Sequence, residues 1–255
     1  MPAEAAAVSE DAVLGGKLVL RQPRRGHRFG HDAILLAAAV PARAGEHAVE
    51  LGAGVGAAGL ALARRVETLK VTLVEIDPQL TALARDNAVR NGLGARVGAV
   101  CLDVAADANA FAAAGLPPGS ADRVLMNPPF NAPQNPSPER GRRVARTASE
   151  ATPAQWLAAA ARLLRPSGTV TLIWRADGLA EVLAALACGF GAISILPVHS
   201  KAGAAAIRVL VGAVKDSGGP LSLLPGLVLA DATGKPTPQA DAVLRDGATL
   251  PLDAS

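Results

Sequence analysis

Apolar and polar positions form two alternating patterns between residues 30 and 215 of the chain. Short, nearly continuous apolar runs are typical of buried parallel strands, and the longer segments between them place apolar residues at helical spacing. The predicted strands cover residues 47–52, 70–77, 95–103, 121–127 and 169–174. The predicted helices cover residues 30–40, 57–66, 78–91, 153–168 and 179–189, with a looser Ala-rich helix before 121–127. This alternation indicates βαβ units.

An alternating chain of this kind predicts an α/β fold with a doubly wound, mostly parallel sheet and right-handed crossovers. Two further apolar runs, 192–200 and 205–215, follow each other closely and predict a terminal antiparallel hairpin, which makes a seven-stranded sheet. Ligands of such sheets bind beyond the carboxyl ends of the strands. We therefore expect the chemistry on the loops after Leu51, Ile76 and Met126, and after Leu102.

Three segments divide the chain by composition. Residues 1–16 are Ala-rich and predict a flexible N-terminal arm, and residues 17–215 hold the predicted α/β domain. Residues 216–255 predict an edge element and a short helix, and we expect this C-terminal appendage to pack on the same domain.

The charge is small overall, +3 at pH 7, but its distribution is uneven. The stretch between Asp11 and Asp32 contains no acidic residue, and arginine, which suits bidentate phosphate contacts, forms two groups. These groups are Lys17, Arg21, Arg24, Arg25 and Arg28, and then Arg140, Arg142, Arg143 and Arg146. Two solvated faces and a nucleic-acid surface explain this pattern equally well.

Compartment and metal signals are weak. Cys101 and Cys188 are far apart without metal-ligand spacing, so we expect reduced, buried thiols, no metal and a cytoplasmic protein. The N-terminus lacks the pattern of a signal peptide, and no apolar run approaches the length of a membrane span.

A glycine-rich stretch, "ELGAGVGAAG", follows the first strand of the alternating region and opens a helix. Glycines allow close approach of a ligand to the backbone, and the helix start offers free N–H groups. Gly54, Gly56 and Gly59 also satisfy the dinucleotide pattern G-x-G-x-x-G. A nucleotide site and a plain strand–helix turn fit this stretch equally well.

Acidic residues around the loop favour a cationic ligand over a pyrophosphate. Glu50 precedes the glycines, and Glu75, Asp77 and Asp103 end the next two strands. Repulsion would disfavour phosphates there, whereas S-adenosylmethionine carries an ammonium and a sulfonium.

The fourth strand ends in "NPPF", residues 127–130. Transfer of a methyl group to a planar amine is helped by acceptors that take hydrogen bonds from its N–H groups. The side chain of Asn127 and the backbone of Pro128 each supply one carbonyl, the prolines fix the turn, and Phe130 offers a stacking surface. An ordinary proline-rich strand exit is the less favoured explanation.

These stretches resemble motifs of class I S-adenosylmethionine-dependent methyltransferases of the Asn-Pro-Pro-Phe/Tyr type. The resemblance covers residues 17–215 through "ELGAGVG", "VEID", "CLD" and "NPPF". "GHRFGHDAILLAA", residues 26–38, and "RRVART", residues 142–147, are similar to segments of the bacterial adenine-N6-methyltransferases that modify valine tRNA. Asn131, where that family often has an aromatic residue, and Thr147, where it often has His or Tyr, depart from its pattern.

The resemblance implies a Rossmann-like methyltransferase fold, S-adenosylmethionine as cofactor and tRNA as partner. The implied cofactor residues are Phe29, Asp32, Glu50, Gly52, Gly54, Gly56, Glu75 and Asp103. The implied catalytic residues are Asn127, Pro128 and Phe130. The arginine groups suggest RNA contacts at Arg24, Arg25, Arg28, Arg142, Arg143 and Arg146.

Several functions stay open at this point. The leading one is methylation of the N6 amine of an adenine in tRNA. The same chemistry serves N2 of guanine in RNA or the side-chain amide of a protein glutamine. A binding module that kept the fold without catalysis is the alternative of another class, and a dinucleotide-dependent oxidoreductase fits least, because it has no use for the Asn-Pro-Pro-Phe turn.

Overall fold

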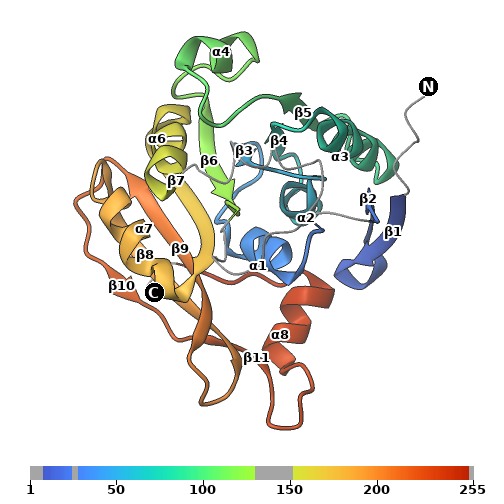
Figure 1. Ribbon diagram of the computed structural model, residues 1–255, viewed down its shortest axis with the longest axis vertical. Helices are drawn as coiled ribbons and strands as arrows, with labels where there is room; N and C mark the ends of the chain where they lie inside the picture. Colours follow the sequence, from blue (N-terminus) through green and yellow to red (C-terminus); the bar gives the residue numbers. More distant parts are fainter. Residues whose placement is uncertain (1–7, 25–27, 130–151, 253–255) are drawn as a thin grey trace, which may run out of the picture.

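A computed structural model of the chain describes residues 8–24, 28–129 and 152–252. Within these ranges the main sheet has nine strands in the order β10-β8-β9-β7-β6-β3-β4-β5, with β11 also paired to β8 (Figure 1). The strands are β3 (His47–Leu51), β4 (Lys70–Glu75), β5 (Val97–Cys101), β6 (Ala121–Met126), β7 (Leu164–Arg175), β8 (Phe190–Lys201), β9 (Ala206–Lys215), β10 (Ser222–Leu223) and β11 (Leu227–Ala230).

The pairing confirms the predicted fold class. Strands β5, β4, β3, β6 and β7 run parallel, and β9 is antiparallel to both of its neighbours, β7 and β8. The strand order reverses direction at β3, where the chain crosses from the β4–β5 side to the β6–β7 side. Such a switch point is the usual ligand-binding position of an open α/β sheet.

Helices cover both faces of the sheet (Figure 1). They are α1 (His31–Ala39), α2 (Ala57–Arg65), α3 (Pro78–Arg90), α4 (Ala108–Ala113), α6 (Pro153–Leu163), α7 (Leu179–Leu186) and α8 (Pro238–Asp241). Buried residues of α1, α2 and α3 belong to one apolar cluster, and those of α4, α6 and α7 to a second. Every residue of α1 from Ala33 to Ala39 is buried, so its Ala and Leu content serves close packing.

The predicted flexible arm over residues 1–16 is wrong for its second half. Val8–Val13 forms β1, which pairs antiparallel with β2 (Leu18–Pro23) through a turn of positive-φ residues at 14–16. Residues 1–7 lie outside the described ranges. Alternation of half-buried and exposed positions along β1, with few large apolar side chains, hid this strand from the hydrophobic pattern.

The C-terminal segment packs against the α/β layers. Short strands β10 and β11 extend the β8 edge in parallel, as the edge element expected there. Further on, the Leu250 amide donates to the Ala38 carbonyl at 2.9 Å, and the side chains of Leu250 and Leu252 are buried in the cluster that contains α1. This segment therefore packs against α1, and Leu252 also lies beside Gly212 of β9.

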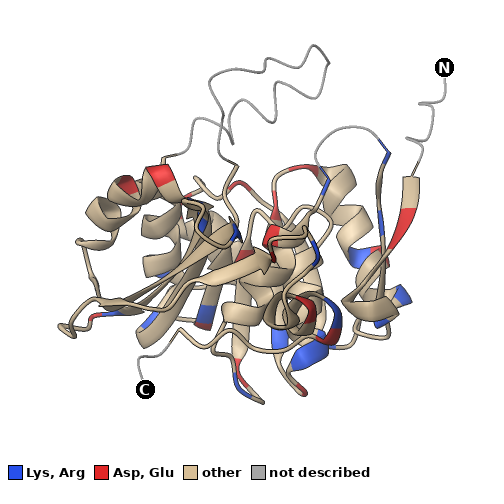
Figure 2. Ribbon diagram, turned by 90° about the horizontal axis from the view of Figure 1, so that it is seen from below, with Lys and Arg blue, Asp and Glu red and all other residues tan. Residues whose placement is uncertain are grey.

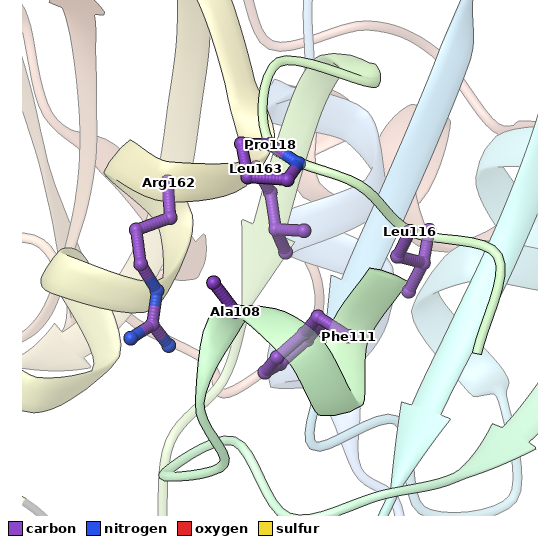
Figure 3. Close-up of a pocket in the computed structure, with 6 residues that line it drawn as sticks. All are labelled: Ala108, Phe111, Leu116, Pro118, Arg162 and Leu163. Carbon is purple, nitrogen blue, oxygen red and sulfur yellow. The ribbon is translucent and has the colours of Figure 1, made fainter. Parts of the chain in front are cut away.

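Two smaller features carry no ligand chemistry. A cavity of about 10 Å³ between α4 and α6, lined by Phe111, Leu116 and Arg162 among others, barely holds one water molecule (Figure 3). Its Arg162 guanidinium carbon lies 5.8 Å from the Phe111 ring centre, a cation–π contact between α6 and α4.

Both cysteines are exposed, so the expectation of buried thiols is wrong.

Across the described ranges, none of the helices combines the length and the apolar character that crossing a bilayer requires. The same ranges contain no group of three or more His, Cys, Asp and Glu side chains arranged to hold a metal ion.

Candidate cofactor and methyl-acceptor site

The strands β4, β3 and β6 end side by side at one edge of the sheet. Leu51 pairs with Val74 on one flank and with Met126 on the other. Gly52 and Asn127 follow β3 and β6 directly, and Glu75 is the last residue of β4, so three neighbouring loops begin here. Sequence reasoning placed the site at this edge, and the register brings its three main segments together.

Positive backbone angles explain the glycines of the loop. Gly52, Gly54 and Gly56 have φ values of +66°, +56° and +84°, a region that favours glycine. Gly56 is the residue that precedes α2, and the Gly54 amide donates to Glu75 Oε2 at 2.7 Å. The loop is thus tied to the end of β4, and the N-terminus of α2 faces the same edge.

Trp156 on α6 also lies beside the glycine loop. A Cβ added at Gly52 would lie 2.5 Å from its ring atom Cη2, so the indole occupies the space beside the glycine. Trp156 is buried, and its Nε1 has no hydrogen-bond partner in the described part of the chain. The glycine at position 52 is the only feature of the sequence that indicates a large side chain beside the loop.

The substitution Gly52→Ala is expected to lower the free energy of unfolding by about 2–4 kcal/mol. Alanine is strained at the positive φ of this position, and its methyl group would clash with the indole of Trp156. Gly54→Ala is the matched control, since its φ is similar but nothing lies within 4 Å of the added carbon. Urea denaturation compares the two. Equal losses for the two variants would show that the indole contact contributes nothing.

Glu50 lies beneath the glycine loop and not on an open surface. The residue is only 4% exposed, and its Oε2 accepts a hydrogen bond from the Gly59 amide at 2.7 Å. Gly59 has no room for a side chain there, because a Cβ would lie 2.7 Å from that oxygen and 2.4 Å from Leu73 Cδ2. Burial, reinforced by the nearby Glu75, raises the pKa of Glu50 to about 8 although the Gly59 amide opposes the shift.

The remaining acidic residues of the loops, Glu75, Asp77 and Asp103, all accept hydrogen bonds from backbone amides. Glu75 is buried and accepts backbone amides on both oxygens, from Gly54 and Asp77. Asp77 caps α3 by accepting from the amides two and three residues ahead, so its role is structural. Asp103 accepts from the Ala105 amide at 2.8 Å, which shapes the loop after β5.

The residues of this edge fit S-adenosylmethionine. A buried carboxyl with a raised pKa is stabilised in its ionised form when a cation arrives, and the cofactor brings two cationic groups. The carboxylate of Glu75, which already accepts two amides, has further lone pairs for hydroxyl donors. The glycine loop supplies the backbone approach for a methionine-like chain.

Asn127 continues β6 into the predicted catalytic turn. Its Oδ1 is buried and has no hydrogen-bond partner among the residues that the structure describes, which is costly for an amide oxygen unless a ligand supplies the donor. Pro128 is buried and Pro129 is exposed, so the turn leaves the sheet at this point. Phe130 and Asn131 lie outside the described residues.

The segment before α1 forms a further part of the predicted cofactor site. The Phe29 amide donates to the side chain of Gln22 on β2 at 3.1 Å, and Gly30 precedes the first turn of α1. Asp32 does not stand free for a ligand, because its carboxylate pairs with Arg208 on β9 at 2.8 Å. Its proposed contact with the cofactor therefore competes with an ion pair that the sequence did not suggest.

The predicted RNA-binding arginines are placed only in part. Arg24 donates to the Val8 carbonyl, and Arg28 pairs with Asp11 and bonds Ser9, so both side chains lie against the N-terminal hairpin. Four others, Arg25, Arg142, Arg143 and Arg146, lie outside the described residues. RNA contact by these six residues stays a prediction.

This glycine loop, buried acid and Asn-Pro-Pro turn on a doubly wound sheet define an S-adenosylmethionine-dependent methyltransferase. The family model described as the methyltransferase small domain matches residues 28–178, more than half of the chain. The chain belongs to this methyltransferase small domain family.

Two curated relatives are tRNA1(Val) (adenine(37)-N6)-methyltransferases. The one from Serratia proteamaculans is 29% identical over 147 residues, which covers 57% of this chain and 54% of the relative. The one from Tolumonas auensis is 28% identical over 171 residues, covering 67% of this chain and 68% of the relative. The matched region thus spans little more than half of the Serratia protein.

A solved structure, the crystal structure of a predicted O-methyltransferase from Agrobacterium tumefaciens, is similar over most of the chain. It is 30% identical with a TM-score of 0.73 and covers 88% of this chain and 100% of the other. This likeness extends beyond the matched domain into the terminal segments.

Proposed function

We propose that the protein methylates the exocyclic N6 amine of an adenine in tRNA. The observation that carries this proposal is the buried Oδ1 of Asn127 after β6, beside the glycine loop, which has no partner within residues 8–24, 28–129 and 152–252. A buried amide oxygen without a donor is suited to a substrate that brings an N–H group. The names of the curated relatives support adenine in tRNA as the source of that group.

The chain's contribution to the reaction is positioning and charge stabilisation. The cofactor supplies an activated methyl group on a sulfonium. Asn127 Oδ1 and the Pro128 carbonyl accept hydrogen bonds from the two N–H groups of the amine, so its lone pair is directed out of the ring system. Phe130 offers its ring as a stacking surface for the base, which must first leave its stack in the RNA.

The cofactor contacts follow from the same edge. Glu50 would interact with the cationic amino-acid part, Glu75 and Asp103 would bind the nucleoside, and Gly52, Gly54 and Gly56 would leave room for it. Phe29 and Asp32 would bind at the start of α1, where Asp32 would have to give up or share its ion pair with Arg208. A tRNA substrate also implies that the protein works in the cytoplasm.

An oxygen acceptor is the competing assignment, since the Agrobacterium structure is titled a predicted O-methyltransferase. A hydroxyl group has one hydrogen to donate, whereas the turn offers two carbonyl acceptors at residues 127 and 128. The amine therefore uses both acceptors and the hydroxyl leaves one unpaired.

The acceptor class is tested with labelled S-adenosylmethionine and three acceptors: tRNA lacking modifications, the same tRNA fully modified, and a mixture of cellular proteins. We expect label in the unmodified tRNA only. Binding to that tRNA should weaken steeply with salt, because arginine–phosphate contacts release counterions. Uptake into protein and not RNA would overturn the proposal in favour of a glutamine acceptor.

A further inference from the structure

The hairpin of β1 and β2 is attached to the domain by an unusual pair of side chains. Asn87 and Asn91, one helical turn apart on α3, stand where a neighbouring strand of β2 would lie. Asn87 accepts from the Arg21 amide at 2.8 Å and donates to the Arg21 carbonyl at 3.0 Å. Asn91 does the same for Val19, at 2.9 Å in both directions.

Asn87 makes one contact that Asn91 lacks. Its Nδ2 also donates to the Val55 carbonyl at 3.0 Å, and Val55 lies between Gly54 and Gly56 in the glycine loop. The Asn87 side chain is fully buried, and all its bonds to β2 and to the loop are made at once. One amide group thus joins the hairpin to the loop on which the cofactor depends.

The next residue of β2, Gln22, contacts the segment ahead of α1. Gln22 is 2% exposed, and its Oε1 accepts the Phe29 amide at 3.1 Å, directly ahead of α1. Its Nε2 donates to Asp11 on β1 at 2.8 Å, and Asp11 is also paired with Arg28. Figure 2 shows the acidic part of β1 in red on this outlying hairpin.

We propose that the β1–β2 hairpin positions the methyl donor, with Asn87 and Gln22 as positioning residues that fix the glycine loop and the Phe29 segment relative to each other. Arg21 and Gln22 are adjacent, so the two tethers start one residue apart on a single strand. A shift of β2 would therefore displace the glycine loop and the Phe29 segment together. The inference rests on the cofactor site assigned above, but not on the identity of the methyl acceptor.

The asparagine pair provides a matched test. Asn87→Ala removes the tether to Val55 together with the Arg21 pair. Asn91→Ala removes the equivalent Val19 pair and a bond to the Asn87 carbonyl, and keeps the Asn87 side-chain bond to Val55. Calorimetry with S-adenosylhomocysteine should show about tenfold weaker binding for Asn87→Ala and a change within twofold for Asn91→Ala. At saturating cofactor, turnover of Asn87→Ala should stay within about threefold of the unaltered protein. Equal affinities in the two variants would overturn the inference and make the hairpin a structural attachment only.

Gln22→Met tests the second tether and serves if Asn87→Ala fails to fold, since Met keeps the buried volume while losing both hydrogen bonds. We expect about fivefold weaker cofactor binding, and affinity equal to that of the unaltered protein would contradict the role of Gln22.

Hydrogen exchange gives a readout independent of activity. In the unaltered protein, bound cofactor should slow exchange of the Arg21 amide at least threefold, and it should not do so in Asn87→Ala. A hairpin whose exchange ignores the cofactor would overturn the proposal. If the protein binds cofactor with these differences yet methylates no adenine, the proposed function fails while this inference stands.

Discussion

Asn127→Ala is expected to reduce methyl transfer by at least about 100-fold while the dissociation constant of the cofactor stays within about threefold. The reason is that Oδ1 has no partner within the described part of the protein and waits for a donor from the substrate. Removing one well-aimed group that stabilises charge in a transition state typically costs a factor of about 100 to 1,000. Single-turnover kinetics and cofactor calorimetry measure the two quantities separately.

Stability gives the same variant a second, less usual signature. An unpaired buried oxygen destabilises the folded state, so its removal should leave the melting temperature unchanged or raise it. In contrast, Asn87→Ala leaves Arg21 and the Val55 carbonyl without their hydrogen bonds to this side chain, so it should lower the melting temperature. Loss of cofactor affinity in Asn127→Ala, or a clear loss of stability, would contradict the role assigned to this side chain.

Glu50 is expected to release a proton when the cofactor binds. Its pKa stands at about 8 in the protein without cofactor, and a cation beside it favours the ionised form. At pH 6, where the amino group of the cofactor is fully protonated, calorimetry in two buffers of different ionisation enthalpy should show close to one proton released. Glu50→Gln should release none and bind more weakly, and proton release equal in both proteins would contradict this assignment.

Folding stability of the cofactor-free protein provides the matching pH dependence. Between pH 4.5, the ordinary pKa of the carboxyl, and pH 8, the folded protein keeps a proton that the unfolded chain has lost. The contribution of Glu50 to the free energy of unfolding is therefore fully present below pH 4.5. It is lost as the pH rises to 8, by at most about 1.4 kcal/mol per pH unit. Glu50→Gln should remove this slope from urea denaturation curves.

The part of the fold that depends on local pattern was predictable. The βαβ alternation gave the central parallel strands and the antiparallel β8–β9 pair, and the glycines at 52, 54 and 56 take the positive φ values that such a loop requires. Asn127 was proposed as a site residue because Asn-Pro-Pro after a buried strand has few structural uses, and its role stays a prediction.

Contacts between distant residues were beyond sequence reasoning. β1 is held by Asn87 and Asn91 through β2, positions about seventy residues apart along the chain, and its own apolar content is low. The pairing of Asp32 with Arg208 joins residues 176 positions apart. The residue types do not reveal these partners in the sequence, because Asn, Asp and Arg are also common on solvated surfaces.

The most direct test of the central claim is the identity of the methylated atom. The purified protein is incubated with labelled S-adenosylmethionine and unmodified tRNA, and the RNA is digested to nucleosides and separated against standards. The site described here predicts label in N6-methyladenosine, lost in Asn127→Ala. Label in N2-methylguanosine or in a ribose O-methyl nucleoside instead would contradict it.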